Sequence, residues 1–202
     1  MKRITLFTIA IFITCPKVYS QIGYLGANFT LGASYQLENS QSAVALGYGI
    51  NYEIIFPQRM RDKEKIGSFS LIATYDNILK RGYNNNFEIL SLRRHEFGLG
   101  AGFDFLNYLN EDYPHTGFAG NTVLKYQFRD LKSPQVLTYC NMIGFSFKMN
   151  ELYKGKFFMV SEIDLQKARI DNQEYQFAYW GFSFIIQRKL HQNSKIFFEN
   201  WI

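Results

Sequence analysis

The sequence is poor in cysteine and has no long apolar segment after its first twenty residues. It contains 2 cysteines. Cys15 lies in an N-terminal segment that we expect to be removed, so Cys140 alone remains and no disulfide can form within the mature chain. No later segment offers the roughly 18 consecutive apolar residues of a membrane-spanning helix. If the mature chain enters a membrane it must do so as a β-barrel, because in lipid only helices and closed barrels pair all their backbone hydrogen-bonding groups.

Proline and net charge are also low. The chain has 4 Pro against 20 Phe and 14 Tyr, a composition that favours pleated strands over long helices or disorder. The formal charge of +5 falls to +2 when the three basic residues of the N-terminal segment are set aside. A net charge this small does not indicate a nucleic-acid-binding protein. The histidines have no second ligand at metal spacing, and the glycines recur at period 2 rather than in a phosphate-binding loop. We therefore expect no metal, no cofactor and no nucleic-acid partner.

Residues 1–20 have the layout of a cleavable secretory signal. The basic pair Lys2 and Arg3 precedes an apolar run over residues 4–14, and Val18 and Ser20 occupy the −3 and −1 positions of a cleavage site. We predict cleavage after Ser20, which leaves residues 21–202 as one domain.

Two alternatives to a cleaved signal remain for the N-terminal segment. A membrane anchor would need about 20 apolar residues, and the run at residues 4–14 is much shorter. A lipoprotein acylated at Cys15 would need an aliphatic and a small residue before the cysteine, where this chain has Phe12 and Thr14. Both alternatives agree less well with the residues than cleavage does.

The rest of the chain alternates apolar with small or polar residues, which is typical of strands with two unlike faces. In residues 96–105, Phe97, Leu99 and Phe103 alternate with Gly98, Gly100 and other small or acidic residues. Because single-chain bacterial barrels have an even number of strands, we expect eight strands, with ten as the alternative and one candidate segment split or merged. The candidate segments are 22–35, 44–56, 68–75, 87–106, 117–128, 135–149, 156–165, 175–187 and 195–202.

The composition of the two faces predicts which one points outward. The apolar face is rich in Phe, Tyr, Leu and Ile and nearly free of charge, as lipid contact requires. The other face is dominated by Gly, Ser, Thr and Asn, which suit the crowded interior of an eight-stranded barrel. Aromatic residues near strand ends are candidates for interfacial girdles: Tyr35, Tyr75, Tyr108, Trp180 and Trp201. The prediction is an all-β fold, a single closed antiparallel up-and-down transmembrane β-barrel.

In pattern and length, residues 22–202 resemble the small outer-membrane β-barrel proteins of the OmpA/OmpX-like class. The resemblance carries no family-specific motif. Chains of that class usually end in an aromatic residue, whereas this one ends with Trp201 followed by Ile202. The resemblance implies export to the outer membrane of a Gram-negative-type cell, with outer-membrane lipid and lipopolysaccharide as surroundings.

Charged residues on the small-residue face predict an ion-pair network in the lumen, because buried charges must be paired. A cation path is one reading of this network, and a set of ion pairs that holds the barrel closed is the reading we favour. Hydrophilic connections at 59–65, 80–86 and 107–115 are candidates for contact with headgroups or a partner protein. The predicted network consists of Glu53, Glu96, Asp104, Lys125, Lys148, Glu162 and Asp164.

Comparison with the barrel-embedded lipid A deacylases supplies the one candidate catalytic site that we consider. His191, Ser194 and Glu199 supply a base, a nucleophile and an orienting carboxylate. In that family His and Ser stand two residues apart on one strand face. His191 and Ser194 stand three residues apart, so in a regular strand their side chains would point to opposite faces.

The leading functional hypothesis is thus a non-enzymatic outer-membrane barrel with a structural, adhesive or narrow-pore role. A lipid-modifying barrel hydrolase is the second hypothesis. A soluble periplasmic barrel that binds an apolar ligand is the third, and it requires an apolar lumen.

Overall fold

The computed structural model of the chain describes residues 21–37, 41–57, 68–83, 89–105, 116–127, 136–170 and 173–193. Within these residues the chain is built almost entirely of strands, and no helix there is long and apolar enough to cross a membrane. The strands are β1 (Gln21–Gln36), β2 (Gln41–Pro57), β3 (Ser68–Tyr83), β4 (Ile89–Asp104), β5 (Thr116–Gln127), β6 (Leu137–Lys148), β7 (Tyr153–Asp164), β8 (Ala168–Ile170), β9 (Gln173–Tyr175) and β10 (Phe177–Asn193).

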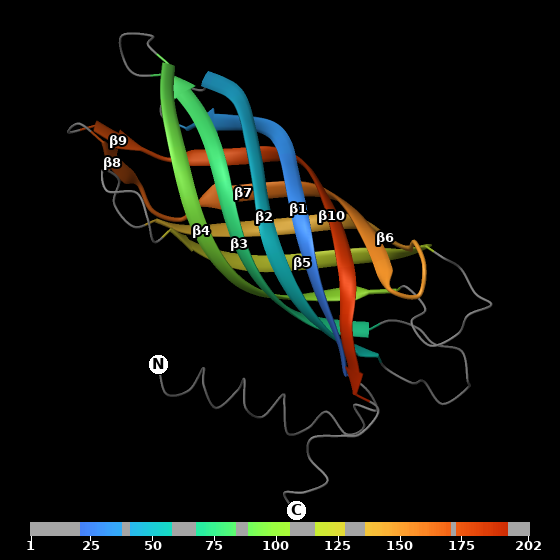
Figure 1. Cartoon of the computed structure of the whole chain (residues 1–202). Coiled ribbons are helices and arrows are strands. Elements are labelled where there is room, and N and C mark those ends of the chain that lie inside the picture. Colours follow the sequence, from blue (N-terminus) through green and yellow to red (C-terminus); the bar gives the residue numbers. More distant parts are fainter. Residues whose placement is uncertain are drawn as a thin grey trace, which may run out of the picture.

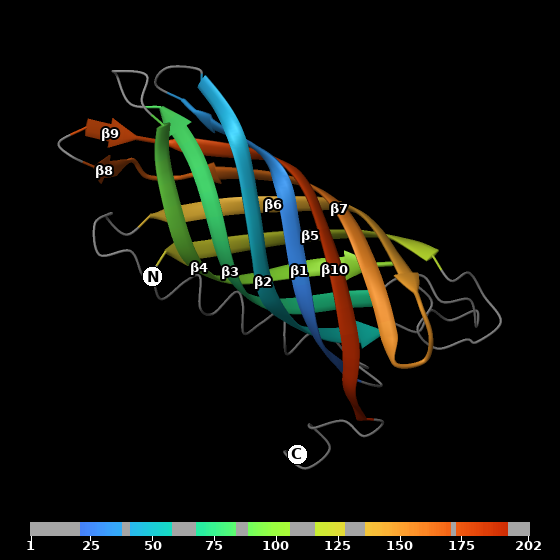
Figure 2. The ribbon, with the colours of Figure 1, turned by 45° about the horizontal axis from the view of Figure 1, so that its top comes forward.

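Eight of these strands close into a barrel in the order β1-β10-β7-β6-β5-β4-β3-β2, and β8 and β9 form a separate two-stranded hairpin (Figure 1). Every barrel strand pairs antiparallel with the next barrel strand along the chain, and β1 closes the ring on β10. The strands are strongly tilted and coiled around the barrel axis, as closure of a small barrel requires (Figure 2). The predicted fold and the count of eight strands are confirmed.

The predicted strand segments agree with the structure one by one over most of the chain. Each of the first eight segments overlaps one barrel strand, so none of them is split or merged. The ninth segment, 195–202, lies outside the described residues. The connections predicted at 59–65 and 107–115 also lie outside them. The connection predicted from residue 80 is wrong at its start, because β3 continues to Tyr83. Sequence alternation fades there, and the hydrogen-bonded ladder with β4 continues without it.

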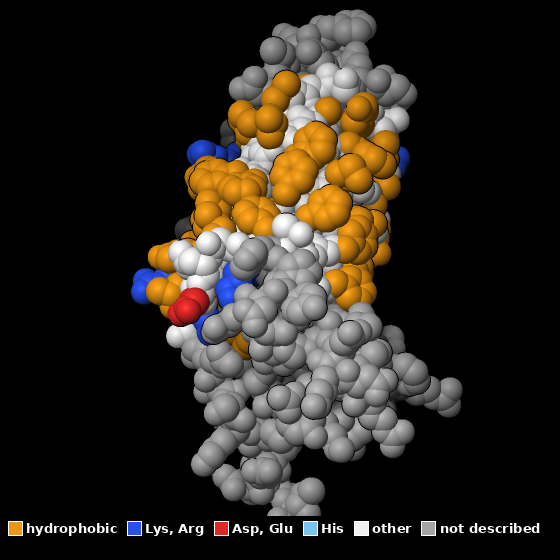
Figure 3. Space-filling view, turned by 90° about the vertical axis from the view of Figure 1, so that its right-hand side faces the viewer, with side chains coloured by type: hydrophobic (Ala, Val, Ile, Leu, Met, Phe, Trp, Pro, Cys, Tyr) orange, Lys and Arg blue, Asp and Glu red, His pale blue; other side chains and the backbone are white. Residues whose placement is uncertain are grey.

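The apolar face points outward, as predicted. Phe97, Leu99 and Phe103 are 45%, 59% and 42% exposed, respectively. Figure 3 shows hydrophobic side chains covering one side of the barrel, with charged side chains at the margins. In the described residues the outward positions of the barrel strands are mostly apolar, and the exposed charged residues among them are Arg93 on β4 and Arg188 on β10. We call this surface the apolar belt. It excludes the soluble-barrel hypothesis, which needs the small-residue faces in water and an apolar lumen.

Two of the predicted girdle residues, Tyr35 and Trp180, lie in one half of the apolar belt. Tyr35 and Trp180 are 40% and 64% exposed on the outer face in the half that is remote from the start of β1, and Tyr75, 37% exposed, lies midway along β3. Phenylalanine dominates the other half, where rings on adjacent strands contact each other, as Phe103 does Phe118. Tyr and Trp prefer the membrane interface, so this half indicates one interfacial girdle. Tyr108 and Trp201 lie outside the described residues.

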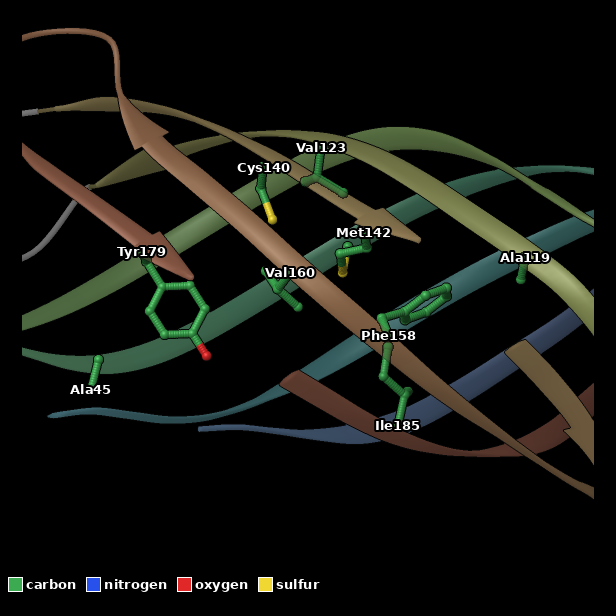
Figure 4. Close-up of a cluster of buried hydrophobic side chains, with 9 residues drawn as sticks. All are labelled: Ala45, Ala119, Val123, Cys140, Met142, Phe158, Val160, Tyr179 and Ile185. Atoms are coloured by element: carbon green, nitrogen blue, oxygen red, sulfur yellow. The ribbon is translucent and has the colours of Figure 1, made fainter. Parts of the chain in front are cut away.

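The lumen side of the wall is filled by side chains rather than left open. A buried apolar cluster lies inside the barrel and draws on several strands (Figure 4). Around it, at both ends, lie buried polar and charged side chains. The cluster consists of Ala45, Ala119, Val123, Cys140, Met142, Phe158, Val160, Tyr179 and Ile185.

Glycine is required where β1 closes on β10. Gly32 pairs with Gly181 across this seam. A Cβ on Gly32 would lie 2.6 Å from the Cα of Gly181 and 2.9 Å from the backbone carbonyl carbon of Trp180. These are backbone atoms that cannot move without opening the ladder, so the close approach of the two strands depends on the missing side chains.

We predict that Gly32→Ala destabilises the folded barrel by about 1–3 kcal/mol, the usual cost of overpacking. Gly120→Ala is the matched control, because a Cβ there meets chiefly the ring of Phe103, an exposed side chain that can turn aside. Urea unfolding of the refolded protein in lipid vesicles, followed by the heat-dependent gel shift, measures both. Equal stability of the two variants would contradict the role of the seam.

Candidate functional site

The lumen holds ten buried charged side chains among the described residues, six acids and four bases, each no more than 5% exposed. Side chains on the inner face of a barrel cannot reach bulk water when the interior is packed, so they must satisfy one another. They do so in three clusters, which we name by position: a terminal cluster near the start of β1, a central cluster, and a distal cluster at the far end. The ten are Glu53, Asp76, Arg94, Glu96, Asp104, Lys125, Lys154, Lys156, Glu162 and Asp164.

The terminal cluster is built around Glu53 on β2. Its carboxylate accepts hydrogen bonds from Lys154 at 2.9 Å and from Lys156 at 2.7 Å, both on β7. Lys156 also lies 3.4 Å from Asp104, and Ser146 donates to the same carboxylate at 2.5 Å. Two acids and two bases make this cluster formally neutral.

The distal cluster is a bidentate pair. The guanidinium of Arg94 on β4 donates to both carboxylate oxygens of Asp164 on β7, at 2.6 and 2.8 Å. Thr138 and the backbone N–H of Phe177 donate to the same carboxylate, and the guanidinium carbon lies 5.3 Å from the centre of the Phe177 ring. The fork geometry of arginine suits such a pair, and the cluster is formally neutral.

The central cluster gathers three acids around one base. The ammonium group of Lys125 lies 2.9 Å from Glu162, 3.0 Å from Asp76 and 3.7 Å from Glu96. Asn28 donates to Asp76 at 2.6 Å. With all three carboxyl groups ionised, this cluster carries a formal charge of −2, unlike the other two.

A small cavity lies beside the central cluster. The centre of a water molecule can move within a volume of about 20 Å³ in this cavity. That is enough for about one water molecule or a small ion. Its wall includes Asp76, Lys125 and Glu162, together with Asn51, Asn121 and other polar and apolar side chains.

The structure distributes the seven residues of the predicted network over these clusters. Glu53 and Asp104 lie in the terminal cluster, Asp164 lies in the distal cluster, and the central cluster contains Glu96, Lys125 and Glu162. Lys148 is half-buried at the last residue of β6 and joins none of the three clusters within the described part of the chain.

Four buried charges were missed by the sequence analysis: Asp76, Arg94, Lys154 and Lys156. The signal that finds them was present. Arg94 stands two residues before Glu96, and Lys154 and Lys156 stand at even spacing before Glu162, so the period of two places each of them on the same face as its predicted neighbour. Asp76 follows Thr74 in the same way. Arg94 and Lys156 lie inside the predicted segments 87–106 and 156–165, and extending the alternation by one step at the strand ends would have included Asp76 and Lys154.

The catalytic alternative falls largely outside the described residues. Ser194 and Glu199 are not among them. The backbone of His191 belongs to β10, which runs to Asn193 and pairs with β1 there, so the chain continues as a strand through the residues where a turn would be needed to bring His191 and Ser194 together. In the described residues no group of three or more His, Cys, Asp or Glu side chains is placed to hold a metal ion.

Comparison with known proteins gives a match of fold only. No protein-family model and no curated protein sequence matches the chain. The crystal structure of Neisserial surface protein A is similar, with a TM-score of 0.60, 12% identity, and coverage of 83% of this chain and 97% of that one. The crystal structure of the outer-membrane protein OprG from Pseudomonas aeruginosa aligns over 85% of this chain and 96% of that one, with 11% identity and a TM-score of 0.45. The chain has the fold of a small eight-stranded outer-membrane β-barrel, as the sequence pattern predicted.

We predict that Arg94→Met destabilises the barrel by about 3–5 kcal/mol, because it leaves the carboxylate of Asp164 buried without its main partner. Arg93→Met is the matched control, since Arg93 is the exposed neighbour on the opposite face of the same strand. Urea unfolding in vesicles measures both. A double variant, Arg94→Met with Asp164→Leu, is expected to recover part of the loss, and a purely additive loss would contradict the pairing.

Proposed function

We propose that the chain is an outer-membrane β-barrel with a closed lumen, and that its role is structural or adhesive rather than that of a pore. The observation that carries the proposal is the sidedness of the wall. Large apolar side chains cover the outside, and bonded charges fill the inside. Such an arrangement is stable in lipid and would be unstable in water, where the belt would be exposed.

The apolar belt supports membrane insertion. A transmembrane barrel needs an outward apolar band bounded by aromatic residues, and this chain has both. The barrel strands are 12 to 17 residues long, more than the about 9–11 residues that cross a hydrocarbon core. The partners that this surface would contact are the acyl chains of outer-membrane lipid, including those of lipopolysaccharide.

The ion-pair clusters support a closed lumen. They link strands on different sides of the ring, and the cavity beside the central cluster admits about one water molecule or small ion. A continuous path for solutes would require several of these pairs to separate together. The surfaces left for recognition are therefore the barrel ends, one of which carries the β8–β9 hairpin.

We predict that Leu99→Arg, in the middle of the apolar belt, destabilises the barrel folded into lipid vesicles by about 2–4 kcal/mol. Leu190→Arg is the control, because Leu190 is also exposed but lies near the end of β10, where the cost is about 0–1 kcal/mol. Equal effects of the two substitutions would mean that the belt does not contact lipid.

We predict that the purified wild-type protein produces no stepwise conductance in planar lipid bilayers, with an open porin as the positive control. Folding of the same sample is checked by its heat-dependent migration on gels. Regular conductance steps from the folded protein would overturn the closed lumen and favour the narrow-pore role.

A further inference from the structure

Three polar side chains stand side by side on the outer face of the apolar belt. Thr122 on β5 pairs with Asn141 on β6, and Asn141 pairs with Ser161 on β7. All three point outward, because they alternate with buried lumen residues along their strands. We call them the polar row. The residues that flank the row along these strands include exposed apolar side chains: Leu124, Tyr139, Ile143, Met159 and Ile163. The polar row therefore lies within the belt and not at its edge.

The pairing of the strands places the polar row at hydrocarbon depth. A path of paired residues that starts at Trp180 on β10 and runs through the row returns to β10 at His191, near the opposite end of that strand. Each step from β10 towards β5 thus descends from the level of Trp180. With strands about 4.8 Å apart and tilted by about 35–45°, one step is about 3 Å along the barrel axis. Asn141 then lies about 6 Å and Thr122 about 9 Å below Trp180, within an apolar band about 25 Å tall.

The hydrogen bonds within the polar row leave donors over. Thr122 donates to the amide oxygen of Asn141 at 2.9 Å. Neither the amide nitrogen of Asn141 nor the hydroxyl of Ser161 has a hydrogen-bond partner among the described residues. In hydrocarbon an unpartnered polar group is expensive. The side chain of asparagine is also too short to carry its amide to the headgroups, as the long stems of lysine and arginine can do.

A second outward asparagine shows how the belt can cover an amide. Asn77 on β3 is 7% exposed, and its amide nitrogen donates to the hydroxyl of Tyr48 at 3.1 Å. Asn141 is more exposed than Asn77, and the wall around it provides only the donor of Thr122. A partner for the amide nitrogen of Asn141 therefore has to come from outside the wall.

A second copy of this chain has the matching chemistry. One amide both donates and accepts, so two copies of Asn141 can exchange a reciprocal pair of hydrogen bonds. A two-fold axis parallel to the barrel axis brings residues of equal depth together, which lets Asn141 meet itself. Two convex barrels touch along few strands, and the short side chains of Thr122 and Ser161 on either side of Asn141 permit a close approach. Acyl chains of lipid offer no hydrogen-bonding group to the row.

We propose that the outer face of β5, β6 and β7 is the interface of a homodimer in the membrane, with Asn141 at its two-fold axis. The dimer removes the polar row from lipid and gives its leftover donors a partner. The proposal goes beyond the proposed function and rests on one premise of it, that the apolar belt contacts lipid. The comparison of Leu99→Arg with Leu190→Arg tests that premise separately.

Disulfide cross-linking in membranes of the expressing cells locates the interface. The chain carries Cys15→Ala and Cys140→Ala, so that an introduced thiol is its only one. Ile143→Cys places the thiol on β6, and Ile50→Cys is the matched control on β2, which stands opposite β6 in the ring. The two isoleucines are 51% and 55% exposed. We expect mild oxidation to give about tenfold more disulfide-linked dimer with Ile143→Cys, because the interface holds the two thiols at high effective concentration.

Two asparagine variants test the role of the polar row. Sedimentation equilibrium of the refolded protein in micelles of a neutral detergent measures the dissociation constant of the dimer. Asn141→Leu is expected to raise this constant about tenfold, because it removes the reciprocal hydrogen bonds, and Asn77→Leu on β3 is expected to leave it unchanged. Urea unfolding in dilute vesicles checks the folded monomer, which Asn141→Leu should not weaken, since it takes a polar group out of lipid.

Three results would overturn the homodimer. Equal cross-linking of Ile143→Cys and Ile50→Cys would mean that the copies meet only by random collision. Cross-linking of Ile143→Cys solely to a species of another mass would assign the polar row to a different protein. A dissociation constant that is the same in Asn141→Leu and in the wild-type protein would place the contact between copies elsewhere on the wall.

Discussion

The structure depends on one constraint: in hydrocarbon every backbone hydrogen-bonding group needs a partner within the protein. Closure of β1 on β10 removes the two free edges that an open sheet of these strands would have. The requirement for glycine at the seam follows from this, because Gly32 and Gly181 approach too closely for side chains. Once the ring is closed, a side chain on a strand can point only into the lumen or to the outer surface. Successive residues of each strand alternate between these two environments.

The ring also reverses the usual role of the interior. In a soluble barrel the hydrophobic effect fills the inside and the charges face water, whereas here the apolar belt faces outward and the charged groups are enclosed. Enclosed charges stabilise only when they are paired with good geometry. The bidentate Arg94–Asp164 pair and the two lysines on Glu53 have that geometry. The central cluster places the ammonium group of Lys125 among three carboxylates.

The sequence predicted the fold better than it predicted the site. Period-2 alternation is a local property, so residues 96–105 alone show which side chains share a face, and the outward position of Phe97 and Leu99 follows. Strand ends were less predictable, because the alternation weakens beyond the belt while the ladder continues, as in the last residues of β3. Which charges pair could not be read from the pattern: Glu53 meets Lys154 and Lys156 across about a hundred residues, and that distance is bridged only by closure of the ring.

Strand β7 connects these observations. Its inner face supplies Lys154 and Lys156 to the terminal cluster, Glu162 to the central cluster and Asp164 to the distal cluster. Ladder hydrogen bonds connect β7 only to β6 and β10, whereas these four side chains reach β2, β4 and β5 on other parts of the ring. A shift of β7 by one residue against its neighbours would turn all four charges into the apolar belt, where a single cation costs about 2–4 kcal/mol. The lumen charges thus favour this register of the wall as well as filling part of the interior.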